Sequence, residues 1–561
     1  MKSKGMKAMM LLSVAGMMFS YVGCSTKQIN AKNEEMEIAT DEIALVAKDQ
    51  SLNEVMVVAY GRTADKKMLT GSVMSICADQ YIQEEIYHSE EEYLSKTENQ
   101  FKSAAETPLS TFSIDVDAAS YGNMRRFINQ GQLPPADAIR TEELINYFSY
   151  DYAKPSGNDP VKISTETGEC PWNTNHRLLR IGIKAKEIAD NKLPTSNFVF
   201  LIDVSGSMSG PTRLDLVKSS LKLLINNLRE QDRVAIVVYA GSAGEVLPST
   251  SGSNKQKIRE ALDNLSAGGS TAGGAGIQLA YKIAQKNFIK NGNNRIILCT
   301  DGDFNVGVSS PEGLEKLIEK ERQSGVFLTV LGYGMGNYKD NRMQTLAEKG
   351  NGNHAYIDNL QEANKTLVGE FGGTLYTVAK DVKLQIEFNP EHVQAYRLIG
   401  YESRLLKDED FNNDAKDAGD MGAGHNVTAF YEIVPTGIPF NAAGSIDPLK
   451  YSQTEKKQKK VYTGSNELLT IKLRYKEPAG NNSRKIELAI TDDKQNNVSS
   501  DFRFAAAVAM FGQLLTRSEW KGAADYNKVI ALAKTALDND EQGYRREFIR
   551  LAETVKGLDK E

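Results

Sequence analysis

One stretch near the middle of the 561-residue chain constrains the fold more than any other. Residues 198–202 form a continuous apolar run, as expected for a strand buried on both faces of a parallel sheet. The helix predicted after it has apolar residues at helical spacing: Leu214, Val217, Leu221, Leu224 and Leu228. Further apolar strands, each separated by a helical pattern, are predicted at 234–239, 295–299 and 326–331. This alternation predicts a doubly wound, mostly parallel α/β sheet over residues 196–376.

The α/β block is flanked on both sides by segments with strand patterns. Apolar and polar residues alternate from Val382 to Phe388, and strands are predicted over 160–190 and 380–495. The α/β domain is therefore predicted to be inserted into a β-sandwich-like domain. Helical patterns predict a helical segment at 107–159, with Asp117 as a helix N-cap, and a helical C-terminal region at 500–561.

Composition excludes several classes of function. The net charge of −6 and a pI of about 5.7 argue against a nucleic-acid-binding protein. A basic run at 456–460 is interpreted as a solvated loop. The four cysteines and five histidines form neither CxxC nor HExxH, which argues against a disulfide framework and a zinc enzyme.

The N-terminus is interpreted as an export signal. Three lysines precede an uncharged run from Ala8 to Gly23, which is too short to span a bilayer, and Cys24 follows. The pattern resembles a bacterial lipoprotein signal, which implies cleavage of residues 1–23 and lipidation of Cys24. The alternative is a plain secretory signal with an incidental cysteine. The predicted location is the bacterial cell envelope, on the periplasmic face or the cell surface, with the outer membrane favoured.

Residues 24–106 are predicted to be a tether. Its first part is polar and acidic, which is typical of a flexible linker. Residues 51–73 resemble the TonB-box and plug entry of nutrient receptors, although the rest of the chain is too short for their barrel. We interpret this stretch as a mobile linker or a leftover of a fused module, with a docking strand as the alternative.

The residues with metal-binding chemistry lie in the α/β block. The apolar strand ends in D-x-S-x-S, formed by Asp203, Ser205 and Ser207. Thr271 lies in a glycine-rich loop before a predicted helix, and Asp301 ends a later apolar strand. Ligands of open α/β sheets bind at the carboxyl ends of the strands. Helix capping and turn formation are the alternative roles for these side chains.

These three pieces, in this order, resemble the metal-ion-dependent adhesion site (MIDAS) of von Willebrand factor A (vWA) domains. The resemblance implies Mg²⁺, or Mn²⁺ or Ca²⁺, bound directly or through water by Ser205, Ser207 and Thr271, and partly through water by Asp203 and Asp301. It also implies an open coordination position that accepts a Glu or Asp of a protein partner. Residues 332–336 match a dinucleotide-binding loop only loosely and are predicted to be a rim loop of the sheet.

Three further stretches, at 109–117, 417–425 and 501–505, resemble bacterial YfbK-type vWA lipoproteins. The sequence therefore predicts a lipid-anchored envelope protein, not an enzyme, that binds a protein partner through a metal site. One alternative is a scaffold whose metal site is only structural. A Mg²⁺-dependent hydrolase is the other, but no general base or G-x-S-x-G nucleophile is apparent.

Overall fold

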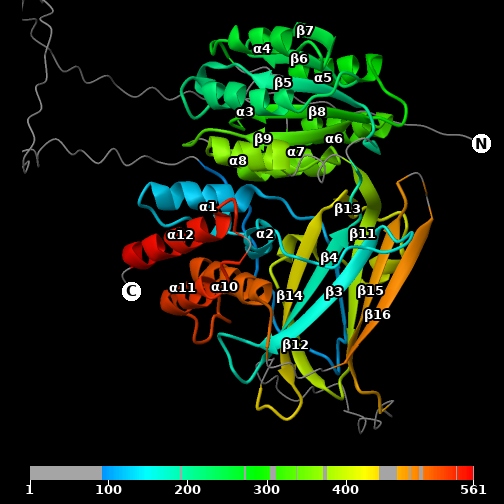
Figure 1. Cartoon of the computed structure of the whole chain (residues 1–561), viewed down its shortest axis with the longest axis vertical. Coiled ribbons are helices and arrows are strands. Elements are labelled where there is room, and N and C mark those ends of the chain that lie inside the picture. Colours follow the sequence, from blue (N-terminus) through cyan, green and yellow to red (C-terminus); the bar gives the residue numbers. More distant parts are fainter. Residues whose placement is uncertain are drawn as a thin grey trace, which may run out of the picture. The chain divides into compact units, whose positions relative to one another are not determined.

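The computed structural model describes most of the chain after residue 90 (Figure 1). The described residues are 91–189, 192–270, 273–302, 311–336, 338–369, 376–440, 464–478, 480, 482–491, 497–538 and 540–559. They all lie in one compact unit, Glu84–Glu561.

An α/β domain is built on a sheet with the described strand order β10-β9-β8-β5-β6-β7. All neighbours are parallel except β7, which runs antiparallel to β6 at the edge. The strands are β5 (Ser196–Asp203), β6 (Arg233–Tyr239), β7 (Ala243–Ser251), β8 (Asn293–Thr300), β9 (Phe327–Gly332) and β10 (His354–Tyr356). This topology confirms the predicted doubly wound sheet.

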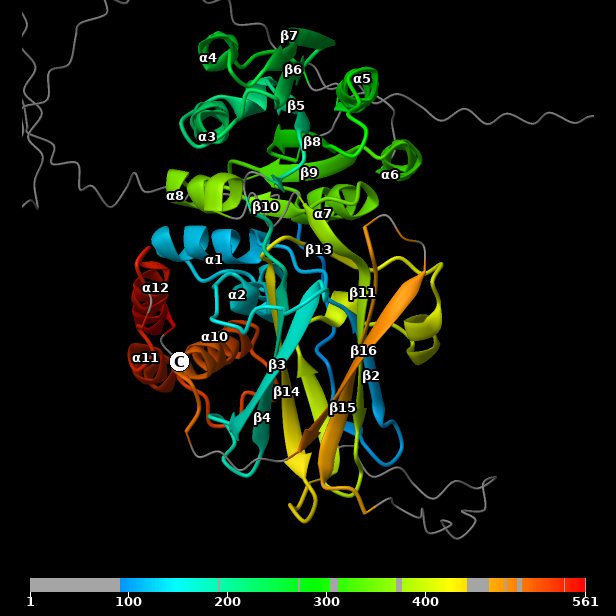
Figure 2. The ribbon, with the colours of Figure 1, turned by 45° about the vertical axis from the view of Figure 1, so that its right-hand side comes forward.

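Helices cover both faces of this sheet (Figure 2). This explains why residues 198–202 of β5 are apolar on both faces of the strand. Phe198, Phe200 and Ile202 pack against one set of helices, whereas Val199 and Leu201 pack against the other. The first set comprises α3 (Leu214–Asn226), α4 (Lys255–Asp263), α8 (Leu360–Asn364) and the π-helical turn Lys365–Gly369. The second set comprises α5 (Gly273–Lys286), α6 (Pro311–Glu321) and α7 (Asp340–Lys349).

A β-sandwich is assembled from strands on both sides of the α/β domain in the sequence. One described sheet has the order β1-β12-β14-β4-β3, and the other has β13-β11-β15-β16 with β2 also paired to β11. The inner faces of the two sheets share one apolar core. The strands are β1 (Lys102–Ser103), β2 (Leu109–Ser113), β3 (Val161–Glu169), β4 (Arg177–Ala185), β11 (Thr377–Phe388), β12 (Val393–Ile399), β13 (Gly419–Gly422), β14 (Asn426–Pro435), β15 (Glu467–Lys476) and β16 (Ser483–Thr491). Because β3 and β4 precede the α/β domain and β11 follows it, the α/β domain is an insertion.

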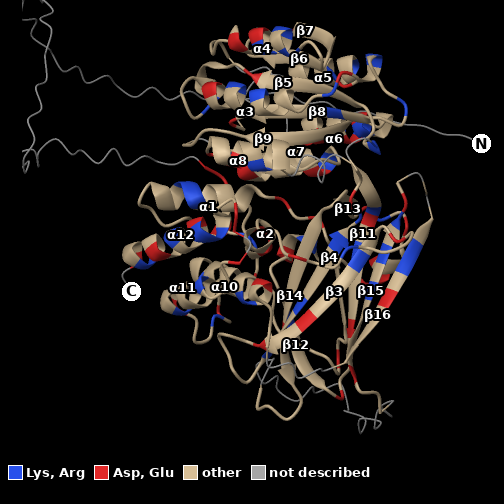
Figure 3. Cartoon of the chain, in the orientation of Figure 1, with Lys and Arg blue, Asp and Glu red and all other residues tan. Residues whose placement is uncertain are grey.

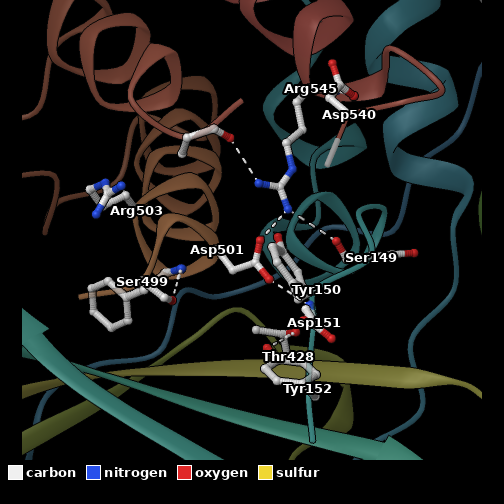
Figure 4. A network of polar contacts seen from close by, with 12 residues as sticks. Ser149, Tyr150, Asp151, Tyr152, Thr428, Ser499, Asp501, Arg503, Asp540 and Arg545 are labelled. Carbon is white, nitrogen blue, oxygen red and sulfur yellow. Dashed lines mark hydrogen bonds and ion pairs between the residues drawn. The ribbon is translucent and has the colours of Figure 1, made fainter. Parts of the chain in front are cut away.

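The remaining described helices pack together around an aromatic core. They are α1 (Ala119–Asn129), α2 (Thr141–Asn146), α10 (Ser500–Leu515), α11 (Tyr526–Lys534) and α12 (Tyr544–Leu558). Figure 4 shows one of their joints, where the carboxylate of Asp501 on α10 accepts hydrogen bonds from Arg545 on α12 (2.5 Å) and from the backbone N–H of Asp151 (2.7 Å). Arg545 also donates to the carbonyl of Ser149 at 3.4 Å. The C-terminal helices are thereby tied to the chain that follows α2.

A second joint, which we call the Arg125 cluster, connects α1 with the α/β domain and with α12. The guanidinium of Arg125 is completely buried and lies 2.5 Å from Asp358, 2.7 Å from Glu362 and 3.1 Å from Glu547. The hydroxyl of Tyr147 accepts a further hydrogen bond from it at 3.0 Å. One arginine therefore satisfies three carboxylates from two regions of the chain.

The prediction that Asp117 caps α1 is wrong. The N-cap is Ala118, and no side chain caps the helix. Asp117 instead accepts a hydrogen bond from the backbone N–H of His354 in the α/β domain (2.9 Å) and an ion pair from Arg404 (3.1 Å). Asp117 therefore binds His354 and Arg404, which are distant in sequence, and not the first turn of α1.

Candidate functional site

The D-x-S-x-S motif lies where β5 ends, near the middle of the α/β sheet. All eight residues of β5 are buried, and Asp203 is the last of them. The chain then turns through Ser205 into a 3₁₀ turn, Gly206–Met208. Since β5 has parallel neighbours on both sides, this turn lies at the edge of the sheet where the other strands also end.

Asp203 is held by neutral hydrogen-bond donors. Its side chain is inaccessible to solvent, and its two carboxylate oxygens accept from the N–H of Ser205 (2.9 Å) and the hydroxyl of Thr300 (3.1 Å). Burial and, to a smaller extent, the charge of Asp301 raise the pKa of Asp203 to about 6, against the hydrogen bonds from Ser205 and Thr300, which lower this pKa. A carboxylate in this environment gains from any cation placed beside it.

The two serines of the motif bring their hydroxyl groups together. The Oγ atoms of Ser205 and Ser207 are 3.0 Å apart, with Ser205 buried and Ser207 partly exposed. The glycine-rich loop packs on this turn, because the N–H of Gly206 donates to the carbonyl of Gly269 (3.0 Å) and that of Gly268 to the carbonyl of Val204 (2.7 Å). The loop predicted to carry Thr271 thus reaches the motif, although Thr271 itself lies outside the described residues.

Asp301 follows the last residue of β8, the strand paired with β5. It is completely buried. The turn after it is fixed by a hydrogen bond from the N–H of Gly302 to the hydroxyl of Thr300 (3.1 Å) and by the left-handed backbone of Gly302 (φ 90°). A side chain at Gly302 would also approach the backbone nitrogen of Lys339 at 3.0 Å. The fold therefore brings Asp203, Ser205, Ser207 and Asp301 to one edge of the sheet.

The donor atoms gathered here fit a hard divalent cation. They are carboxylate and hydroxyl oxygens, which Mg²⁺ prefers. Among the residues that the structure describes, no group of three or more His, Cys, Asp or Glu side chains could hold a metal. A cation at this edge would therefore depend on the serine hydroxyls as well as on the two aspartates.

The rim beside Asp301 includes residues that the sequence did not single out. The loop at 332–336 follows β9, and the N–H of Tyr333 donates to the carbonyl of Thr300 at 2.9 Å. Glu91, far away in sequence, accepts hydrogen bonds from the N–H of Gly336 (2.9 Å) and from Arg126 on α1 (2.8 Å). Because these partners are more than 200 residues apart or on another element, no local pattern signals them.

Besides the role of Thr271, three further sequence predictions lie outside the described residues. They concern lipidation at Cys24, the TonB-box-like stretch at 51–73 and the basic run at 456–460. All three stay predictions. No described helix is both long enough and apolar enough to cross a membrane.

Family models match three parts of the chain. The model of the von Willebrand factor type A domain matches residues 197–370, and that of "Uncharacterized protein YfbK, C-terminal" matches residues 373–558. A model described as von Willebrand factor matches residues 87–180. These matches follow the α/β domain, the returning strands with the C-terminal helices, and the segment before β4.

Individual proteins are similar over different lengths. The Escherichia coli protein named "Uncharacterized protein YfbK" is 48% identical over 476 residues, which are 83% of this chain and 81% of that protein. Human inter-alpha-trypsin inhibitor heavy chain H3 is 25% identical over 254 residues, covering 42% of this chain and 28% of that protein. A solved structure of a von Willebrand factor type A protein from Catenulispora acidiphila is 15% identical with a TM-score of 0.37, covering 81% of this chain and 91% of that chain.

Proposed function

The chain belongs to the YfbK family of proteins with a von Willebrand factor type A domain, and on that premise we propose that it binds a protein partner through a divalent cation. One observation carries the proposal. Asp203 is completely buried beside Asp301 at the ends of paired strands, and the donors to its two oxygens among the described residues are neutral. A buried carboxylate is costly without a positive charge nearby, and a bound cation supplies that charge.

The chain's own residues would divide the task of holding the ion. Asp203 and Asp301 supply negative charge, while Ser205 and Ser207 supply hydroxyl oxygens at 3.0 Å from each other. Thr271 is proposed as a further ligand because its glycine-rich loop packs on the motif. The ion, which we propose to be Mg²⁺, or Mn²⁺ or Ca²⁺, supplies a positive centre that attracts a Glu or Asp of the partner.

The proposal is one of binding and includes no catalytic step. The hydroxyl of Ser205 is engaged with that of Ser207, and the backbone N–H of Ser205 is engaged with Asp203. These contacts hold the oxygen atoms of Asp203, Ser205 and Ser207 close together, as ligands of one shared ion must be. We also propose that Cys24 carries a lipid that anchors the protein in the bacterial cell envelope.

Titration calorimetry with Mg²⁺ and Mn²⁺ tests the cation site. We expect one site in the parent chain and none in Asp203→Ala or Asp301→Ala. Ser209→Ala is the matched control, because Ser209 is exposed two residues beyond the motif. Equal binding in the parent and in both aspartate variants would refute the assignment.

A separate experiment tests the partner. The full-length protein is used as bait against extracts of its own envelope, with Mg²⁺ or with EDTA, and Asp203→Ala is the control bait. We expect a captured protein that is lost with EDTA and with the variant, and weakened by Thr271→Ala. Capture at full strength in EDTA would show that recognition lies elsewhere, and that the cation site is structural if calorimetry still detects it.

A further inference from the structure

The strand β16 forms an edge of the sandwich. It runs for nine residues, Ser483–Thr491, and β15 is its only neighbour among the described strands (Figure 2). Alternate residues of an edge strand present N–H and C=O groups that no neighbour has paired. This edge can therefore accept another strand.

The inner side of β16 is apolar and incompletely covered. Ile486, Leu488 and Ile490 lie on the face that packs against the sandwich core, yet all three are only partly buried. Their cross-strand neighbours on β15 are Leu473, Ile471 and Leu469, each at most 1% exposed. The apolar side chains are therefore fully buried on β15 but only partly buried on β16, the outermost strand. A further strand paired with β16 would bury them.

The charges of β16 do not protect this edge by repulsion. Arg484 pairs with Glu477 at 3.0 Å, and Lys485 pairs with Glu487 at 2.8 Å. Figure 3 shows both positively and negatively charged segments on β16. Unpaired lysines on an edge normally keep other strands away. Here each positive charge has a negative partner on the same copy, so two such edges can approach without net repulsion.

We propose that the chain pairs with a second copy of itself through antiparallel β16 strands centred on Leu488. This register places Leu488 opposite Leu488 of the second copy and Ile486 opposite Ile490 in both directions. The three apolar residues of each strand then meet only apolar residues. On the outer face Glu487 lies opposite Ala489, so that no like charges meet.

Neighbouring registers are worse for the same sequence. Centring the pair on Glu487 places two carboxylates directly opposite each other, which is destabilising. Centring it on Ile486 places Arg484 opposite Leu488, so that the apolar row meets a charged one. Of these three registers, the one centred on Leu488 is therefore the one in which β16 of a second copy complements β16 best.

Light scattering after size-exclusion chromatography measures the association. We expect the full-length protein to have twice the mass of one chain at tens of micromolar, and Leu488→Lys to have the mass of one chain. Ala489→Lys is the matched control: it adds the same charge on the outer face, opposite Glu487, and should leave the dimer intact. A parent that is monomeric at 100 µM, or a Leu488→Lys variant that remains fully dimeric, would overturn the proposal.

Disulfide formation tests the register without disturbing the fold. Opposite residues of antiparallel strands have Cα atoms about 4.5–5.5 Å apart, within disulfide range. Leu488→Cys should therefore form a dimer under mild oxidation. In Ile486→Cys the two cysteines are four residues out of register, about 13 Å apart, and should not react. The parent measures the background from natural cysteines, of which Cys170 and Cys299 are buried. Equal cross-linking of the two variants would refute the register.

Discussion

Two buried charged sites in this molecule solve the same problem in opposite ways. In the Arg125 cluster, a completely buried guanidinium forms ion pairs with Asp358, Glu362 and Glu547. At the end of β5, Asp203 is equally buried, but its oxygens accept from neutral donors, among them the backbone N–H of Ser205 and the hydroxyl of Thr300. At the first site the chain itself supplies a cation to the carboxylates, whereas the donors described around Asp203 are neutral and a ligand can supply the cation.

The difference separates charges that hold the domains together from charges that we propose to serve binding. The contacts of Arg125 join α1, the α/β domain and α12, so that losing them affects the packing of the whole molecule. The contacts of Asp203 stay within the edge of one sheet. Four experiments test this difference between the two sites.

The largest effect is expected at Arg125. Arg125→Met leaves the buried Glu362 and the partly buried Asp358 and Glu547 without this cation, which should lower the free energy of unfolding by about 3–5 kcal/mol. Urea denaturation monitored by circular dichroism measures this loss. The variant should retain its response to Mg²⁺ as long as the α/β domain stays folded. A loss below about 1 kcal/mol would mean that the cluster is not a structural joint.

Asp203→Asn should change the response to cations rather than the fold. At a Mg²⁺ concentration of 100 times the Kd, binding should stabilise the parent by about 2.7 kcal/mol, and this gain should vanish in the variant. Without Mg²⁺ the variant should be at least as stable as the parent, because a poorly solvated charge has been removed. Thermal unfolding with and without the ion measures both quantities. If Mg²⁺ stabilises Asp203→Asn as much as the parent, Asp203 does not bind the ion, and the two sites do not differ in the way described.

Glu143 on α2 is intermediate between the two sites, because a cation lies near it but does not fully offset the cost of its burial. It is 3% exposed, and burial raises its pKa to about 7 although Arg140 lies 3.4 Å away and lowers it. The unfolded chain releases this proton near pH 4.5, so Glu143 makes the fold lose stability as the pH rises from about 4.5 to 7.

Glu143→Gln should remove this part of the pH dependence. Relative to the parent, we expect the variant to gain on the order of 1–3 kcal/mol at pH 8 compared with pH 4. Urea denaturation at the two pH values measures the difference, and Glu230→Gln, at an exposed position, serves as the control. The opposite sign would show that Arg140 compensates Glu143 fully.

The smallest effect is expected at the surface. The side chains of Lys222 and Asp263 are 2.5 Å apart but are 37% and 53% exposed. Lys222→Ala should change the free energy of unfolding by about 0.2–1 kcal/mol and should lose part of that effect at high salt. A loss as large as that of Arg125→Met would mean that burial does not govern these ion pairs.

The two sites also differ in how far the sequence predicts them. Asp203, Ser205 and Asp301 end or follow apolar strands, and the carboxyl ends of parallel strands share one edge, so local patterns suffice to bring them together. Arg125 looks like an ordinary helix residue, and its partners lie 233 and 422 residues away. The prediction for Asp117 fails for a related reason. Aspartate is a common N-cap residue, but His354 and Arg404, which are distant in sequence, contact Asp117 instead.

The insertion of the α/β domain has a consequence for synthesis. Strand β4 pairs with β14 residue by residue from Lys184 with Asn426 to Arg177 with Ile433. Ribosomes add residues one after another, so β4 emerges long before its partner, whereas every strand of the α/β sheet has emerged by Tyr356. The inserted domain can therefore finish folding before β14, the central strand of one sandwich sheet, has been synthesised. Until then the apolar faces of β3 and β4 are exposed. A nascent chain from which Gly369 but not β14 has emerged would carry a folded α/β domain, with its proposed cation site, on an incomplete sandwich.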